Sequence, residues 1–158
     1  MTSYPKGIII YTYYDENKQL GVTFMQDFNY TVLQFHMSDD ARNHLNSVGW
    51  GGDFGRYPEL AIQRDVKFSG GSEGFSSWMS KYFVAVSDID AGDLEGVFHV
   101  GNMGPEEKIN RRSKMHSVSV GDVVRCNRTG TFHMVDGCGF TQLLSFTHPA
   151  FGAVACSR

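Results

Sequence analysis

The stretch that decides the fold is Tyr30-Thr-Val-Leu-Gln-Phe-His-Met-Ser-Asp-Asp-Ala-Arg-Asn-His-Leu-Asn-Ser-Val-Gly49. Apolar and polar side chains alternate from Leu33 to Met37, which predicts a strand with one buried and one wetter face. Ser38 then supplies an N-cap, two acids follow it, and Gly49 closes the pattern, so a helix is expected over about 39–48. A strand that leads directly into a short helix indicates an α+β domain.

Further strands are expected on both sides of this stretch. Residues 7–14 are rich in β-branched and aromatic side chains, and polar residues follow before 20–25, so we expect an N-terminal hairpin. The same signals predict further elements downstream, namely strands at 81–87, 118–125, 130–135 and 140–146 and a short helix at 93–100. Together they predict a β-rich α+β single domain with short helices and an N-terminal hairpin or meander.

Composition sets the broad class of the protein. The chain has 158 residues, of which 41% are hydrophobic, and its net charge is −3, which fits a folded domain. The longest uninterrupted apolar run is only Ile8-Ile9-Ile10, and the first residues lack the pattern of a signal peptide, so we expect no membrane contact and a cytoplasmic location. The three cysteines are an odd number and fit a reducing compartment without a disulfide framework.

Two parts of the chain differ in character. Residues 1–80 are expected to form a β-meander with one short helix and glycine-rich loops, and residues 81–158 a second half that packs with the first as one domain. Charge is uneven as well, because residues 105–158 carry seven Lys or Arg against four Asp or Glu in an acidic protein. The two parts are therefore expected to attract each other or to present faces of opposite sign.

The second half carries an ordered set of motifs. They are Tyr82-Phe-Val-Ala-Val86, Asp93-Leu-Glu-Gly-Val-Phe98 with Asn102, His116-Ser-Val-Ser-Val-Gly-Asp-Val-Val124, and Val135-Asp136 with Gly139-Phe140. This order resembles the YodL-like domain over about residues 81–146, with 116–124 as the most specific piece. The sequence departs from that family between Asn102 and His116, where 108–114 is unusually basic.

The resemblance implies where such a protein acts rather than what chemistry it performs. YodL-like domains occur in bacteriophage, prophage and plasmid proteins, including large multidomain proteins of mobile elements. The resemblance brings no catalytic residue with it, and a fold alone does not define a function. We therefore expect a non-enzymatic accessory protein that binds a host or defence protein in the bacterial cytoplasm, in the manner of a counter-defence factor, with self-association as a further expectation.

The expected partner-binding surface is the loop Trp50-Gly-Gly-Asp-Phe-Gly-Arg-Tyr57. It offers rigid aromatic anchors and a guanidinium on a glycine-rich backbone, which are the residue types that dominate protein interfaces. We name five residues of this loop as the site: Trp50, Asp53, Phe54, Arg56 and Tyr57. The alternative is that Trp50 and Phe54 belong to the core while the glycines serve turn geometry.

Nucleic-acid binding is the second interpretation. Four cations fall within residues 108–114, and two more follow a turn downstream, where a hairpin is expected to bring them close to the first four. Such a patch contacts phosphates, and nearby aromatic rings such as Phe132 could stack on bases. The residues concerned are Lys108, Arg111, Arg112, Lys114, Arg125 and Arg128. The alternative is a solvated loop that balances the acidic first half.

Two sets of reactive side chains complete the candidates. His116, with Ser117, Ser119, Asp122 and Asp136 near it, is compatible with a small hydrolase, but a tight turn into a valine-rich strand explains the motif better. Cys126, His133 and Cys138 lack the knuckle spacing of a zinc site. We therefore name no catalytic residue, metal ligand or cofactor, and a virion or assembly protein stays open as a further alternative.

Overall fold

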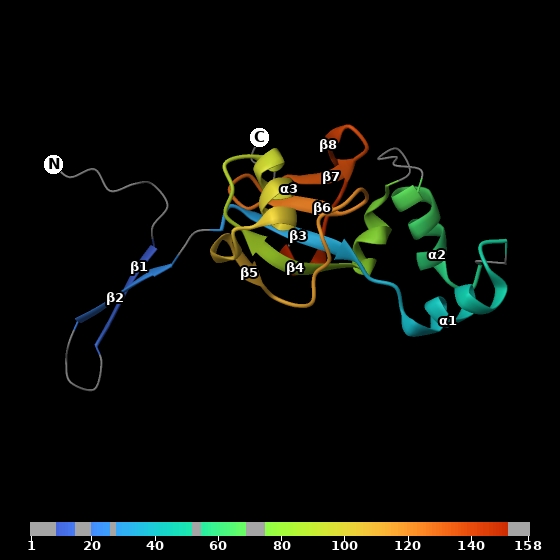
Figure 1. Ribbon diagram of the computed structural model, residues 1–158, viewed down its shortest axis with the longest axis horizontal. Helices are drawn as coiled ribbons and strands as arrows, with labels where there is room; N and C mark the ends of the chain where they lie inside the picture. The colour runs from blue at the N-terminus through green and yellow to red at the C-terminus, as the bar shows by residue number, and fades with distance from the viewer. Residues whose placement is uncertain (1–8, 15–19, 26–27, 52–54, 69–74, 152–158) are drawn as a thin grey trace.

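The computed structural model describes residues 9–14, 20–25, 28–51, 55–68 and 75–151. Within these residues the β-rich α+β prediction is confirmed, because six antiparallel strands form one sheet that short helices accompany (Figure 1). The strands of this sheet are β3 Tyr30–Phe35, β4 Phe83–Ile89, β5 Ile109–Arg111, β6 Val123–Cys126, β7 Phe132–Asp136 and β8 Gly139–Gln142. A separate two-stranded sheet pairs β1 Ile9–Tyr14 with β2 Leu20–Met25, as the expected hairpin requires.

The order of strands in the larger sheet is β5-β4-β3-β6-β7-β8. β3 comes from residues 1–80, yet it lies between β4 and β6, which come from residues 81–158. The sheet is therefore built from both parts of the chain. β5 was not expected from the sequence, because its basic composition predicts a loop; it pairs with β4 only from Ser87 to Ile89.

In the described part of the chain, three regular helices and several short turns of helix accompany the sheet, with α3 over one face and α1 and α2 together beyond the end of β3 (Figure 1). Their bounds are α1 Asp39–Val48, α2 Pro58–Ile62 and α3 Leu94–Met103, with a π-helical turn at Gln63–Phe68 and 3-10 turns at Ser77–Tyr82, Glu106–Lys108 and Pro149–Phe151. The prediction for α1 is confirmed at both ends, since the Ser38 hydroxyl accepts from the Ala41 N–H and Gly49 follows with φ +68°. α2 and the π-helical turn were missed, because their residues carry only a weak local pattern.

Apolar side chains fill both sides of the sheet. On one face Val32 and Val124 pack with Val97 and Val100 of α3, and on the other Leu33 and its neighbours pack with the turns after α2 and before β4. Because both faces are covered, the whole of Tyr30 to Gln34 is buried. The expectation that Gln34 lies on a wetter face is therefore wrong, although His36 is exposed as expected.

The valine-rich motif forms a tight turn, as its structural interpretation predicts. Val118, Val123 and Val124 are buried, whereas Val120 is only half-buried. The Asp122 N–H bonds the Ser119 carbonyl across a β-turn whose third residue, Gly121, has φ +88°, a conformation that favours glycine. The strand expected over 118–125 is therefore shorter than predicted, because its first residues are used for this turn.

α3 and this turn are held together at two places. Asn102 donates from Nδ2 to the Val118 carbonyl oxygen at 3.0 Å. Gly101 faces the same valine so closely that a Cβ at this position would collide with Val118 Cγ2. The helix, the asparagine and the valine-rich turn of the motif thus form one packed unit, in which Gly101 permits the close approach.

Candidate binding groove

A groove of about 820 Å³ lies where the sheet meets α1. Its walls come from five separate parts of the chain: the end of β3 and the residues after it, α1, the start of the π-helical turn after α2, the first half of β4, and the segment between β5 and the valine-rich turn. The lining residues are Gln34, Phe35, His36, Met37, Arg42, Leu45, Gln63, Val84, Val86, Ser113, Lys114, Met115 and His116. Its size falls within the range of about 300–1,000 Å³ that is usual for ligand sites in proteins.

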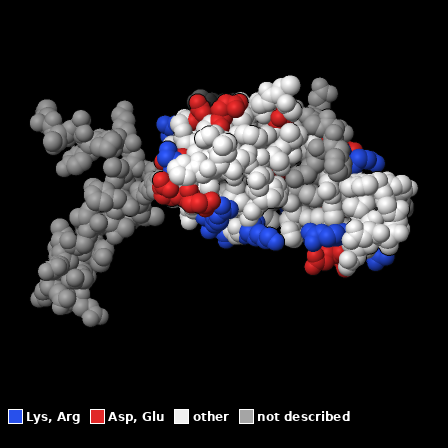
Figure 2. Space-filling view, viewed as in Figure 1, with Lys and Arg blue, Asp and Glu red and all other residues white. Residues whose placement is uncertain are grey.

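The groove is positively charged although the protein is acidic. Arg42 and Lys114 line it together with His36 and His116, and the described residues of its lining include no Asp or Glu. Arg42 lies 3.4 Å from Asp39 one helical turn away, but both side chains are exposed, so this pair holds the guanidinium only weakly. In Figure 2, Lys and Arg side chains follow the edge of the molecule from β5 to α1, with acidic side chains among them.

The rest of the groove is largely aliphatic. Val84 leaves 42% of its surface exposed there, and Leu45 and Met115 are half-buried beside it. Methionine adapts its shape to different neighbours, and an exposed aliphatic surface gains stability when a ligand covers it. The combination of apolar surface and cationic rim is typical of a binding site.

One wall of the groove is fixed by Gln34, a polar side chain that is only 3% exposed. Its Oε1 accepts the His116 backbone N–H at 3.0 Å, and its Nε2 donates to the His116 carbonyl oxygen and to Asp122 Oδ2, both at 2.9 Å. The fully buried Asp122 carboxylate also accepts the Ser119 N–H at 3.0 Å. These bonds tie the segment before the valine-rich turn to the middle of the sheet.

The hydrolase alternative receives little support from the surroundings of His116. Its Nδ1 lies 2.8 Å from the Ser117 carbonyl oxygen and 3.0 Å from Gln34 Nε2. Since both hydrogens of Gln34 Nε2 have carbonyl or carboxylate acceptors, the arrangement fits a proton on Nδ1 that is donated to Ser117. The nearest carboxylate oxygen, on Asp122, is 3.8 Å from Nδ1 and is engaged by Gln34 and Ser119.

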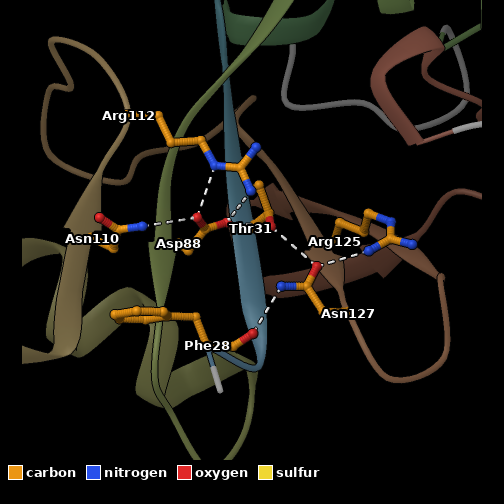
Figure 3. Close-up of polar contacts among 7 residues, drawn as sticks. All are labelled: Phe28, Thr31, Asp88, Asn110, Arg112, Arg125 and Asn127. Carbon is orange, nitrogen blue, oxygen red and sulfur yellow. Dashed lines mark hydrogen bonds and ion pairs between the residues drawn. The ribbon is translucent and has the colours of Figure 1, made fainter. Parts of the chain in front are cut away.

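A buried carboxylate organises the cations beside β5. Asp88, 6% exposed, receives two bonds of 2.8 Å from the Arg112 guanidinium and one of 2.7 Å from the Thr31 hydroxyl (Figure 3). The Thr31 oxygen also lies 3.0 Å from Asn127 Oδ1, which accepts from Arg125 at 2.8 Å. Arg112 and Arg125 therefore serve a network that crosses the sheet.

The six cations named for nucleic-acid binding do not form one patch. β4 and β3 separate β5 from β6, so strands about 4.8 Å apart place the two groups roughly 14 Å from each other, and the expected hairpin contact is wrong. Arg111 donates from Nη2 to both carboxylate oxygens of Glu106. Arg125 lies over the Phe151 ring at 4.5 Å, and burial lowers its pKa. Lys114 lines the groove, Lys108 is half-buried and Arg128 is exposed.

The loop expected to bind a partner is described only in part, because Asp53 and Phe54 lie outside the described residues. Trp50 is 44% exposed just after α1, and Arg56 is exposed with its guanidinium 5.7 Å from the centre of the Tyr57 ring. Tyr57 is half-buried against the small core between α1 and α2. Trp50 and Arg56 thus stay candidates for contact with a partner, whereas Tyr57 also has a structural role.

Cys126, His133 and Cys138 are the side chains that were considered for a zinc site in the sequence. Among the described residues, no three His, Cys, Asp or Glu side chains gather as a metal ion would need.

Burial opposes ionisation of Cys126, but hydrogen bonds from the Thr129 hydroxyl and from the backbone of Thr129 and Arg128 outweigh it, so the pKa of this thiol lies below its usual value. Cys126 and Cys138 are free thiols, and Cys138 is exposed.

Comparison with known proteins identifies no relative. No protein-family model, no curated protein and no solved structure matches the chain. In the part of the chain that the structure describes, no helix has both the length and the apolar character needed to cross a membrane.

The sequence did not identify most of the groove residues as functional. Only Lys114 and His116 were among the candidate site residues. Arg42 follows the two acids of the α1 N-terminus and reads as an ordinary surface residue, and Val84 reads as a core residue of a strand. One feature of the sequence does indicate a polar contact at the groove wall. Gln34 interrupts the apolar residues of a buried strand, and its amide needs a hydrogen-bond partner once it is buried.

Proposed function

We propose that this chain is a non-enzymatic binding protein of a bacteriophage or other mobile element, and that its ligand is a host or defence protein in the bacterial cytoplasm. The groove beside α1 carries this proposal, because it joins exposed aliphatic surface to a cationic rim and is held open by bonds within the protein. The motif order of residues 81–146, which resembles the YodL-like domain, supports the origin in a mobile element.

The test is an affinity purification from host lysate, followed by reconstitution with the purified partner. Val84→Asp alters the groove and Trp50→Ala alters the exposed loop, while Leu144→Asp places the same acid at an exposed leucine outside both surfaces. We expect Val84→Asp to weaken the reconstituted complex and Leu144→Asp to leave it intact. If Trp50→Ala alone weakens it, the loop is the binding surface, and if no partner protein is recovered and reconstituted, the proposal is wrong.

A further inference from the structure

We infer that the groove takes an acidic peptide segment of the partner, with apolar side chains on the aliphatic surface and carboxylates between Arg42 and Lys114. This inference rests on the proposed function and names the chemistry that the partner must present. Three properties of the groove lead to it: its charge, its apolar surface and the rigidity of one wall.

Charge selects the sign of the ligand. Arg42 on α1 and Lys114 on the segment between β5 and the valine-rich turn both line the groove, and none of the described residues of its lining is acidic. Asp39, at the exposed start of α1, holds Arg42 only weakly, and Asp122 is buried and accepts from Gln34 and Ser119. A ligand carboxylate would thus meet cations from two sides, and complementary charge favours its approach.

Apolar surface selects a peptide over a polar polyanion. Val84, Leu45 and Met115 are exposed or half-buried apolar side chains, and they gain most from contact with apolar side chains of a ligand. Nucleic acid bound at such a site would bring phosphates and flat bases, for which runs of cations and exposed aromatic rings are needed. Among the described residues of the lining, Phe35 is the single aromatic ring apart from the two histidines, and it also packs edge-on against Phe83.

The wall that carries Lys114 is preformed. At one end, the N–H groups of Arg112 and Ser113 bond the Val86 carbonyl oxygen at 2.9 and 3.2 Å. At the other end, the backbone of His116 is bonded on both sides by the Gln34 amide. The segment is therefore tied at both ends across the sheet, so little ordering has to accompany binding, and this favours affinity for a short segment.

The experiment selects peptides on the intact protein. A displayed library of random twelve-residue peptides is passed over the immobilised full-length chain, and enriched sequences are synthesised and measured by fluorescence polarisation. We expect enriched peptides to combine Asp or Glu with Val, Leu, Ile, Met or Phe, and their affinity to fall as salt is raised. Recovery of no peptide, or of basic or uncharged peptides, overturns the inference.

Two charge reversals then locate the site. The double variant Arg42→Glu with Lys114→Glu should weaken the selected peptides about tenfold or more, because each reversal replaces an attraction by a repulsion. The control is Arg64→Glu combined with Lys81→Glu, which changes the net charge equally at exposed residues outside the groove. Equal losses in both variants would mean that charge acts without a site and would overturn the inference.

Failure of this inference can be told apart from failure of the proposed function. If the reconstituted partner protein binds the groove reversal variant as tightly as the wild type, the protein is a binder but the groove does not take an acidic segment. A twenty-nucleotide single-stranded DNA and its duplex are measured under the same conditions. Tighter binding of either than of any peptide, lost in the groove variant, would assign the site to nucleic acid instead.

Discussion

Gln34 pairs its side-chain amide with the backbone of His116 as a neighbouring strand would, accepting the His116 N–H at 3.0 Å and donating to its carbonyl oxygen at 2.9 Å. A glutamine in a central strand of the sheet therefore takes the place of main-chain pairing at His116, while the start of the same segment bonds the Val86 carbonyl oxygen of β4. The remaining hydrogen of Nε2 goes to Asp122, the residue that closes the valine-rich turn. One side chain thus connects the groove wall, the turn and β3.

Replacing Gln34 by alanine should lower the free energy of unfolding by about 2–4 kcal/mol. The change leaves the His116 backbone and the buried Asp122 carboxylate without their partner, and an unsatisfied buried polar group costs about 1–3 kcal/mol, more where a charge is involved. Urea denaturation measures the loss. Gln142→Ala, at an exposed glutamine of β8, is the matched control and should change stability by less than about 0.5 kcal/mol. Equal effects of the two substitutions would show that the amide pairing does not stabilise the fold.

Replacing Asp88 by alanine should cost about 2–4 kcal/mol, because hydrogen bonds to charged groups contribute about 1.5–3 kcal/mol and three neighbours lose their acceptor together. These neighbours are Arg112, Thr31 and Asn110. The control is Asp39→Ala, which breaks an exposed pair with Arg42 and should cost less than about 0.5 kcal/mol. A double-mutant cycle with Arg112→Ala tests the pairing directly, and a coupling energy near zero would contradict it.

Gly101→Ala should destabilise the protein by about 1–3 kcal/mol, although alanine is the better helix former. The added methyl group meets Val118 Cγ2, so α3 has to move away from the valine-rich turn. The control is Gly92→Ala, where an added Cβ meets nothing within 4 Å. Combining Gly101→Ala with Val118→Ala should cost less than the sum of the single changes, and strict additivity would count against the collision.

Local signals in the sequence were sufficient for the elements whose ends are marked by capping residues. Ser38 and Gly49 delimit α1 as expected, because the cap bonds involve only neighbouring residues. The sequence does not show which side of α1 is buried: Val48 is apolar but 47% exposed, because the core between α1 and α2 ends before it. Which side of a helix is buried depends on what packs against it.

The groove could not be predicted because its parts meet only after folding. Val84, Arg42 and Lys114 come from a strand, a helix and an irregular segment, and no local pattern relates them. The basic residues were named as one nucleic-acid-binding patch, but the strand order separates Arg112 from Arg125. Arg112 is also bound by the buried Asp88. Strand order depends on long-range pairing, and amino-acid composition does not show which strands pair.

The last prediction concerns pH. Burial lowers the pKa of His133, whose imidazole lies on β7 with Nε2 3.1 Å from the Thr131 hydroxyl. In the unfolded chain the same imidazole titrates near 6.5. At pH values between its folded pKa and 6.5, the unfolded state therefore binds more protons than the folded state. The free energy of unfolding thus rises with pH in this window, and the contribution of His133 is lost as pH falls below about 6.5.

His133→Gln should remove this contribution and flatten the dependence, as measured by urea denaturation at intervals from pH 5 to 7.5. His99→Gln, at an exposed histidine of α3, is the control and should keep the slope of the wild type. Carboxylates that titrate at lower pH affect all three proteins alike, so the difference between the two variants isolates His133. A slope in His133→Gln as steep as in the wild type would mean that this imidazole is protonated equally well in the folded and unfolded states.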